Sequence, residues 1–252
     1  MSSHLFSLNG KKALVTGASR GIGRAIAEGL AAAGADVAIA ARNTGALEDC
    51  AKAVRDLGRN AHAIHLDVSD VSSCRRGVAE AAEKLGGLDI LVNNAGVEQV
   101  CPSLDIEEDL WDRIIDTNLK GAFFAAQAAA RLMKGGAVLN LCSLTSERGI
   151  STAVPYGSSK TGLVGMTRAL AVEWAPLGIR VNALEPGYFR TALTEAFYQN
   201  SAWQLAMLAN IPMQRFGELD DLVGASVFLC SDAARYITGV CLPVDGGTLA
   251  SL

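Results

Sequence analysis

The sequence predicts one α/β domain built on a parallel sheet with helices on both faces. Three observations lead to this fold class. Short runs rich in apolar and β-branched residues alternate with helix-length segments along the whole chain. Gly or Pro residues stand at the ends of the helical segments. At 252 residues, half of them hydrophobic, the chain is long enough to fill one large core.

Seven runs are strand candidates, because each is a short apolar stretch bounded by turn-forming or polar residues. Between them lie helical patterns such as GIGRAIAEGLAAAG and LVGMTRALAVEWAPLG. Parallel strands need helix-length crossovers, so this alternation predicts right-handed βαβ units wound on both sides of the sheet. In order, the candidates are ALVT (13–16), DVAIAA (36–41), AHAIHL (61–66), DILVN (89–93), AVLNLC (137–142), RVNALE (180–185) and VCLPV (240–244).

The alternation is interrupted once, between about residues 188 and 216. The loop there is long and rich in amides and aromatic residues, among them Tyr188, Phe189, Phe197, Tyr198 and Trp203. Long insertions at the carboxyl ends of parallel strands are where ligands are covered. We therefore expect a single domain, 1–252, with a substrate lid at about 188–216. The alternative is a helical excursion that only buttresses the fold.

Composition excludes several classes of partner. The 22 basic and 26 acidic residues give a formal net charge of -4, and no Lys/Arg cluster stands out, so nucleic acid is not expected as a partner. The longest uncharged run, residues 196–214, is interrupted by amides and a proline, so no membrane span is expected. The first residues show no signal-peptide pattern, and the six cysteines form no CxxC pair. We expect a cytoplasmic protein with free thiols.

No metal site is expected. All three histidines lie at or before residue 65, and the one close pair is His62 and His65. On a strand these two side chains would point to opposite faces. Cys142 could suggest a thiol nucleophile, but it has no basic partner nearby in the sequence, and we assign it to the sheet.

The first strand candidate runs into a glycine-rich turn that opens a helix, in ALVTGASRGIG. Gly17, Gly21 and Gly23 would let the backbone approach a pyrophosphate closely, and the helix N-terminus would supply amide donors. Residues 17–21 also match the G-x-S-x-G nucleophile elbow of hydrolases, with Ser19 as the nucleophile. That enzyme class needs a histidine late in the chain, and none follows residue 65, so the hydrolase interpretation is disfavoured.

A second constellation consists of Ser143, Tyr156 and Lys160. Tyr156 and Lys160 are four residues apart in a helical segment, so both side chains should lie on one face. A lysine ammonium beside a phenol favours the phenolate, so we expect the pKa of Tyr156 to be lowered, which would make it a usable acid and base. Ser143 ends a strand candidate and could hold a substrate oxygen. The alternative is a lysine that merely covers a packed tyrosine.

These and other motifs resemble the short-chain dehydrogenase/reductase family, in particular members similar to gluconate 5-dehydrogenase and 3-oxoacyl-carrier-protein reductase. The motifs occur in the family's order and spacing from about Phe6 to the end of the chain. They are TGASRGIG (16–23), NNAG (93–96), Asn118 in DTNLKGAFF, Ser143, YGSSK (156–160) and PGYFRT (186–191).

The resemblance implies a Rossmann fold with a seven-stranded sheet, a nicotinamide cofactor and four catalytic residues. Asn118 would order a water linked to Lys160, Ser143 would polarise the substrate oxygen, and Tyr156 would pass a proton to or from it. Lys160 would also hold the nicotinamide ribose. The expected cofactor-binding residues are Gly17, Ser19, Arg20, Gly21, Ile22, Gly23, Arg42, Asp67, Val68, Asn94, Ala95, Gly96, Tyr156, Lys160, Pro186, Gly187 and Thr191.

Cofactor choice can be argued from two arginines. An acid at the end of the second strand would accept hydrogen bonds from the adenosine ribose and repel a 2'-phosphate. The chain has Ala41, Arg42 and Asn43 there, and Arg20 lies in the glycine turn. Two guanidinium groups favour the phosphate, so NADP(H) is the preferred cofactor and NAD(H) the alternative.

The expected function is interconversion of a secondary alcohol and a ketone on a small sugar acid, polyol or keto-sugar. One alternative is a 3-oxoacyl-carrier-protein reductase, but Arg131, Lys134 and Arg180 make a thin basic patch for an acidic carrier. Another is a non-catalytic nucleotide-binding regulator, against which the four complete catalytic positions argue. The resemblance, with the apolar segments FFAAQAAARLM and VGMTRALAVEW, also leads us to expect a homotetramer.

Overall fold

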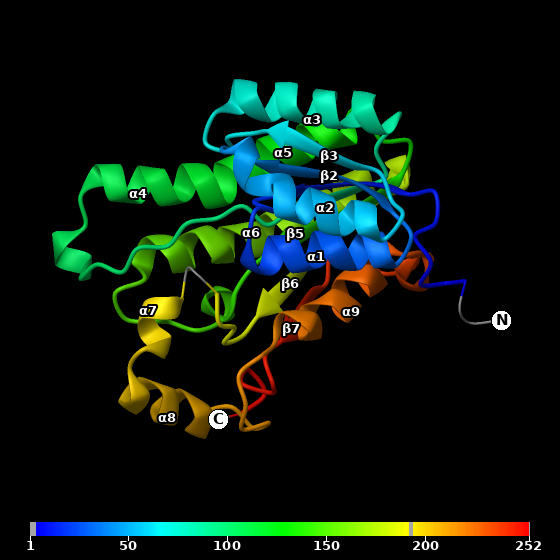
Figure 1. Cartoon of the computed structure of the whole chain (residues 1–252). Helices are drawn as coiled ribbons and strands as arrows, with labels where there is room; N and C mark the ends of the chain where they lie inside the picture. Colours follow the sequence, from blue (N-terminus) through cyan, green and yellow to red (C-terminus); the bar gives the residue numbers. More distant parts are fainter. Residues whose placement is uncertain (1–3, 192–193, 252) are drawn as a thin grey trace.

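A computed structural model describes residues 4–191 and 194–251. Its centre is a seven-stranded parallel sheet in the order β3-β2-β1-β4-β5-β6-β7, which confirms the predicted fold class (Figure 1). Every strand lies within one or two residues of its candidate run. The strands are β1 (Lys12–Thr16), β2 (Asp36–Ala41), β3 (Ala61–His65), β4 (Ile90–Asn93), β5 (Gly136–Leu141), β6 (Ile179–Pro186) and β7 (Cys241–Val244).

Helices cover both faces of the sheet, and each face has its own hydrophobic core. On one face, α1 (Gly21–Ala32), α2 (Glu48–Asp56) and α9 (Leu219–Cys230) pack residues such as Ile26, Val54 and Leu222 against the strands. On the other, α3 (Val71–Leu85), α5 (Gly121–Ala130) and α6 (Val154–Trp174) pack residues such as Val78 and Trp174. This alternation of layers buries both faces of the parallel strands, as such sheets require.

The remaining helical segments are short and lie mainly in the connections. They are α4 (Glu108–Ile115), α7 (Glu195–Tyr198), α8 (Ser201–Ala209), the π-helical η3 (Asp116–Lys120) and the 3-10 turns η1 (Thr44–Leu47), η2 (Ser103–Asp105), η4 (Leu144–Ser146), η5 (Ala175–Leu177) and η6 (Asp232–Ala234). No helix in the described ranges is long and apolar enough to cross a membrane.

β1 pairs with both β2 and β4, so the chain winds outward from β1 in two directions. In sheets of this kind the connections diverge at the carboxyl ends of these two central strands and leave a crevice between them. The fold therefore predicts the location of a ligand site from topology alone, at the ends of β1 and β4.

A chain of buried polar side chains joins four elements inside the core. The Asn93 amide on β4 donates to the Ala122 carbonyl of α5 and to the Asn140 side chain of β5, both at 3.0 Å. Asn140 in turn donates to the Thr167 hydroxyl of α6 at 2.8 Å, and that hydroxyl donates to the Leu163 carbonyl at 2.8 Å. We name these three side chains, Asn93, Asn140 and Thr167, the amide ladder. It connects α6 to β4 and β5 from inside the core.

The segment expected as a lid contains α7 and α8, which extend away from the sheet near the end of β6 (Figure 1). Four aromatic rings hold it together: Tyr198 packs edge-on against Trp203 and Phe216 at 5.2 and 4.8 Å, and Tyr188 against Trp203 at 5.9 Å. Residues 192–193 of the expected lid and the side chain of Phe197 lie outside the described residues, as do residues 1–3 and 252 of the expected domain.

Candidate active site

The glycine-rich turn connects the end of β1 to the first turn of α1. Gly17 has a φ of +66°, and a Cβ there would lie 2.8 Å from the Ala95 Cα, so the turn requires glycine. At Gly23 a Cβ would lie 2.5 Å from the Gly17 carbonyl oxygen. The Asn94 side chain donates to the carbonyls of Thr16 and Gly17 at 2.9 and 3.1 Å, which ties the turn to the end of β4.

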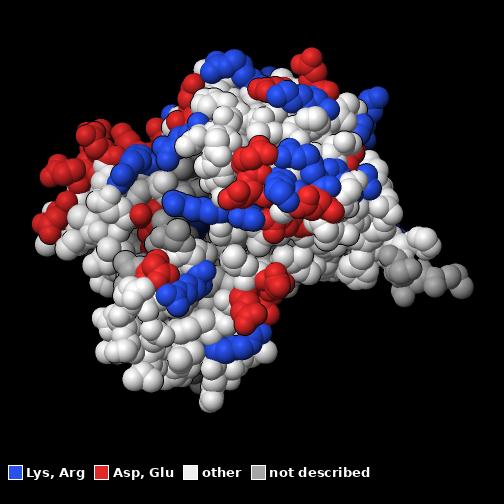
Figure 2. All heavy atoms as spheres, viewed as in Figure 1, with Lys and Arg blue, Asp and Glu red and all other residues white. Residues whose placement is uncertain are grey.

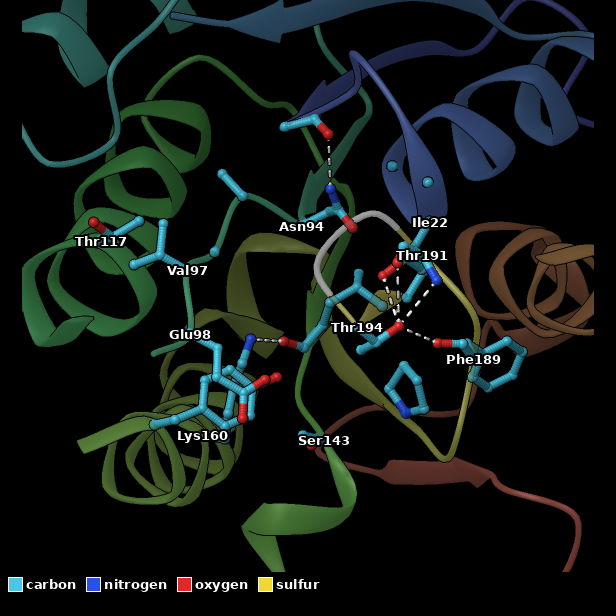
Figure 3. A pocket seen from close by; sticks show the side chains of 18 of the residues that line it. Ile22, Asn94, Val97, Glu98, Thr117, Ser143, Lys160, Phe189, Thr191 and Thr194 are labelled. Carbon is cyan, nitrogen blue, oxygen red and sulfur yellow. Dashed lines mark hydrogen bonds between the residues drawn. The ribbon is translucent and has the colours of Figure 1, made fainter. Parts of the chain in front are cut away.

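A cavity of about 1090 Å3 opens at this edge of the sheet and extends from the glycine turn to α6. This volume suits a dinucleotide together with a small substrate. Every residue predicted to bind the cofactor lines it, and so do Ser143, Tyr156 and Lys160. Figure 3 shows Ser143 coming from the end of β5, Lys160 from α6 and Thr191 from the segment after β6. The structure therefore brings together residues that are up to 174 positions apart, from Gly17 to Thr191.

Lys160 lies deep in the site, with 5% of its surface exposed. Its ammonium donates to the Leu141 carbonyl at 2.6 Å and lies 5.6 Å from the centre of the Tyr156 ring, so both side chains share one face of α6 as predicted. Burial lowers the pKa of Lys160. The Ser143 hydroxyl accepts a hydrogen bond from the Thr145 amide at 3.2 Å.

The expectation that Lys160 lowers the pKa of Tyr156 was wrong for this structure. The pKa of Tyr156 lies above its usual range, chiefly because burial disfavours the phenolate and secondly because the Glu98 carboxylate is close. A hydrogen bond with Ser143 acts in the opposite direction. The assignment of Cys142 to the sheet region is consistent with its burial directly after β5, where a hydrogen bond with Cys241 and burial raise its pKa and disfavour a thiolate.

Asn118 is the one predicted catalytic residue that does not line the cavity. It is 2% exposed and lies in η3, a π-helical segment between α4 and α5. Its side chain accepts from the Val97 amide at 2.8 Å and donates to the Val97 carbonyl at 2.9 Å. It also donates to the Ser159 hydroxyl at 3.1 Å, and Ser159 donates to the Tyr156 carbonyl at 2.7 Å. Asn118 thus holds the segment after β4 against the first turns of α6.

The other end of the cavity carries the two predicted arginines. Arg20 precedes α1, Arg42 follows β2, and both are exposed at the cavity's edge. Neither makes an ion pair with any residue in the described ranges, whereas six other arginines there pair with a carboxylate. Figure 2 shows basic side chains beside a hollow on this face of the molecule. Asp67 and Val68 lie on the same side, after β3.

Sequence reasoning missed several residues of the cavity wall. Glu98 and Arg113 line it at and near α4. Thr194 lines it from the segment after β6, where its hydroxyl accepts a hydrogen bond from the Thr191 amide at 2.9 Å. Glu98 could have been found, because it is an acidic residue two positions after the NNAG motif, which begins at the end of a central strand. Thr194 and Arg113 carry no comparable signal, since they reach the site only through the folding of long connections.

Comparison with known proteins agrees with this geometry. A family model described as enoyl-(acyl carrier protein) reductase matches residues 17–248. Gluconate 5-dehydrogenase of Gluconobacter oxydans (strain 621H) is 39% identical over 251 residues, 98% of each chain.

Two solved structures are also closely similar. A protein of Sinorhizobium meliloti 1021, provisionally described as a short-chain alcohol dehydrogenase, is 60% identical, with a TM-score of 0.97 over 98% of this chain and 100% of that one. A gluconate 5-dehydrogenase from Burkholderia cenocepacia J2315, solved with NADP and tartrate, is 37% identical, with a TM-score of 0.97 over the whole of both chains. With the motifs, the cavity and these similarities taken together, the chain belongs to the short-chain dehydrogenase/reductase family.

Proposed function

We propose that this protein is an NADP(H)-preferring oxidoreductase that interconverts a secondary alcohol and a ketone on a small polyhydroxy substrate. One observation carries the proposal. Ser143, Tyr156 and Lys160 line one part of a cavity that also extends to the glycine turn and two unpaired arginines. A cavity of this composition binds a dinucleotide and presents proton-transfer groups to its reactive ring.

The glycine turn fits the cofactor, because side chains at Gly17 or Gly23 would collide with neighbouring atoms where a pyrophosphate must approach the backbone. When bound, the nicotinamide supplies or accepts the hydride. Arg20 and Arg42 would hold the adenosine 2'-phosphate, and the remaining cofactor-binding residues would orient the two rings. The gluconate 5-dehydrogenase neighbour solved with NADP supports this choice of cofactor.

The chain's own residues would manage the proton. In the direction of ketone reduction, the Tyr156 hydroxyl would donate its proton to the substrate oxygen while the Ser143 hydroxyl holds that oxygen. The raised pKa of Tyr156 keeps the phenol protonated and therefore ready to donate. Lys160 would place positive charge beside the tyrosinate that remains. Asn118 would act as a positioning residue through Val97 and Ser159.

A small sugar acid, polyol or keto-sugar is the proposed substrate class. The similarity to gluconate 5-dehydrogenase supports it. A carrier-bound acyl chain is disfavoured because exposed acidic residues cluster at the start of α4, beside the segment that lines the cavity, and would repel an acidic carrier (Figure 2). These residues are Asp105, Glu107, Glu108, Asp109 and Asp112. The segment 188–216, with its aromatic cluster, is the proposed lid over this substrate.

We also propose that the protein is a homotetramer in the cytoplasm. Apolar side chains stay exposed on and beside the two helices expected at interfaces: Val172 on α6 is 80% exposed, and Leu132, just after α5, is 45% exposed. All six cysteines are free thiols, as suits a reducing compartment. Light scattering at micromolar concentration tests the assembly, and a stable monomer would contradict it.

The decisive experiment compares kcat/KM for 5-ketogluconate and related keto-sugars with that for an acetoacetyl thioester, with NADPH oxidation as the signal. We expect the keto-sugars to be preferred. A preference for the thioester by tenfold or more would reassign the enzyme to carrier-bound acyl groups. Absence of turnover across the whole panel would support the non-catalytic regulator instead.

A further inference from the structure

Glu98 lies in the cavity wall directly after Val97, whose backbone is hydrogen-bonded by the Asn118 side chain. Both the amide and the carbonyl of Val97 are bound by the Asn118 side chain, at 2.8 and 2.9 Å. On the other side, the Arg113 guanidinium donates to the Gln99 side chain. These contacts hold the chain on both sides of Glu98 at the cavity wall.

The Glu98 carboxylate lies close to the groups that would transfer the proton. Figure 3 shows its side chain beside Lys160, approaching from the segment after β4 while Lys160 approaches from α6. The same carboxylate contributes to the raised pKa of Tyr156. Burial also raises the pKa of Glu98, and the Lys160 charge opposes that rise. Glu98 therefore faces the part of the site where the reacting oxygen must lie.

This carboxylate makes no hydrogen bond and no ion pair with any residue in the described ranges. The carboxylate lines the cavity, and its oxygens have acceptor positions to offer to a bound molecule. A substrate hydroxyl supplies the missing donor, whereas a substrate carboxylate at this place would be repelled.

We propose that Glu98 determines substrate specificity by accepting a hydrogen bond from a hydroxyl on the carbon next to the reacting carbon. This inference rests on the proposed oxidoreductase function and narrows its substrate class to vicinal diols and α-hydroxy ketones. Where such a substrate also carries an acid group, that group lies at the end of the molecule away from Glu98.

Two small ketones that differ by one hydroxyl test the proposal. Acetoin carries a hydroxyl next to the carbonyl carbon and 2-butanone does not. We expect the intact enzyme, with NADPH, to prefer acetoin in kcat/KM by about tenfold or more, the range for a hydrogen bond to a charged acceptor. Glu98→Ala should lose most of this preference, because kcat/KM for acetoin should fall several-fold further than kcat/KM for 2-butanone. Glu98→Gln keeps an acceptor but not the charge, so its preference for acetoin should lie between those of the intact enzyme and Glu98→Ala.

Glu147→Gln is the matched control, because it removes an exposed carboxylate that does not line the cavity, and it should leave the preference unchanged. Equal losses on both ketones in the Glu98 variants would overturn the inference, since they would indicate a structural role or an effect on Tyr156 alone. If keto-sugars are reduced but acetoin is not preferred over 2-butanone, the inference fails and the proposed function stands. If no ketone in the whole panel is reduced, the proposed function itself fails.

Discussion

Glu185 should make the protein less stable as the pH rises through neutrality. It lies at the end of β6, is 2% exposed, and its Oε1 atom has no hydrogen-bond partner among the described residues. Burial raises its pKa from 4.5 to about 7, the Glu147 and Asp245 carboxylates add to the rise, and Arg168 opposes it. The folded protein therefore binds this proton more tightly than the unfolded chain does.

The sign and size of the effect follow from linkage. A raised pKa in the folded state gives stability that is present at low pH and is lost as the pH rises from about 4.5 through about 7. Each pKa unit corresponds to about 1.4 kcal/mol, so the whole loss is about 3 kcal/mol, most of it between pH 5 and pH 8. Glu185→Gln cannot ionise and should escape it.

Urea unfolding of the intact protein and of Glu185→Gln at pH 5 and pH 8 measures this difference. The variant should gain about 2 kcal/mol or more relative to the intact protein on going from pH 5 to pH 8. Glu173→Gln, which removes an exposed carboxylate on α6, is the matched control and should show no such gain. Parallel pH dependence of Glu185→Gln and the intact protein would refute the reasoning, because it would mean that Glu185 is charged in the folded state at both values.

Two further predictions concern the site, and a third concerns the amide ladder. Tyr156→Phe keeps the ring and removes the proton donor, so kcat should fall by about 100-fold or more while the dissociation constant for NADPH changes little; near-normal turnover would show that another group is the acid. Arg42→Asp should weaken NADPH binding far more than NADH binding, and steady-state constants for both cofactors measure this. An unchanged cofactor preference would indicate that Arg20, and not Arg42, binds the 2'-phosphate. Thr167→Val breaks the amide ladder and leaves the Asn140 amide without its acceptor, so stability measured by urea unfolding should fall by about 1–3 kcal/mol, and an unchanged unfolding midpoint would contradict the ladder's structural role.

The sheet could be predicted because its signals are local. Each strand is a run of apolar residues whose length and boundaries are visible in the sequence, and every observed strand begins and ends within two residues of its run. The glycine turn could also be predicted from the sequence. Gly17 and Gly23 have no room for a side chain, because any such turn brings its backbone close to neighbouring atoms. All the residues predicted to bind the cofactor line the cavity, and their contacts with it stay a prediction.

The substrate end could not be predicted to the same depth, because its properties depend on distant neighbours. The pKa of Tyr156 was expected to fall on account of Lys160, one helical turn away. Its direction is instead set by burial and by Glu98, which is 58 residues away in sequence. Asn118 likewise reaches the site indirectly, through Val97 and Ser159, and sequence spacing carries no information on such contacts.

The amide ladder has a consequence for how this enzyme can change over evolutionary time. Thr167 lies seven residues, or about two turns, after Lys160, so the two residues occupy nearly the same side of α6. The helix that carries the proposed acid Tyr156 and Lys160 is thus tied to the sheet by a core side chain that does not line the cavity. Replacements at Glu98 or between residues 188 and 216 can alter what is recognised while the anchored pair stays in place. New specificities should therefore arise from a handful of changes at the mouth of the cavity, and an engineer could begin there.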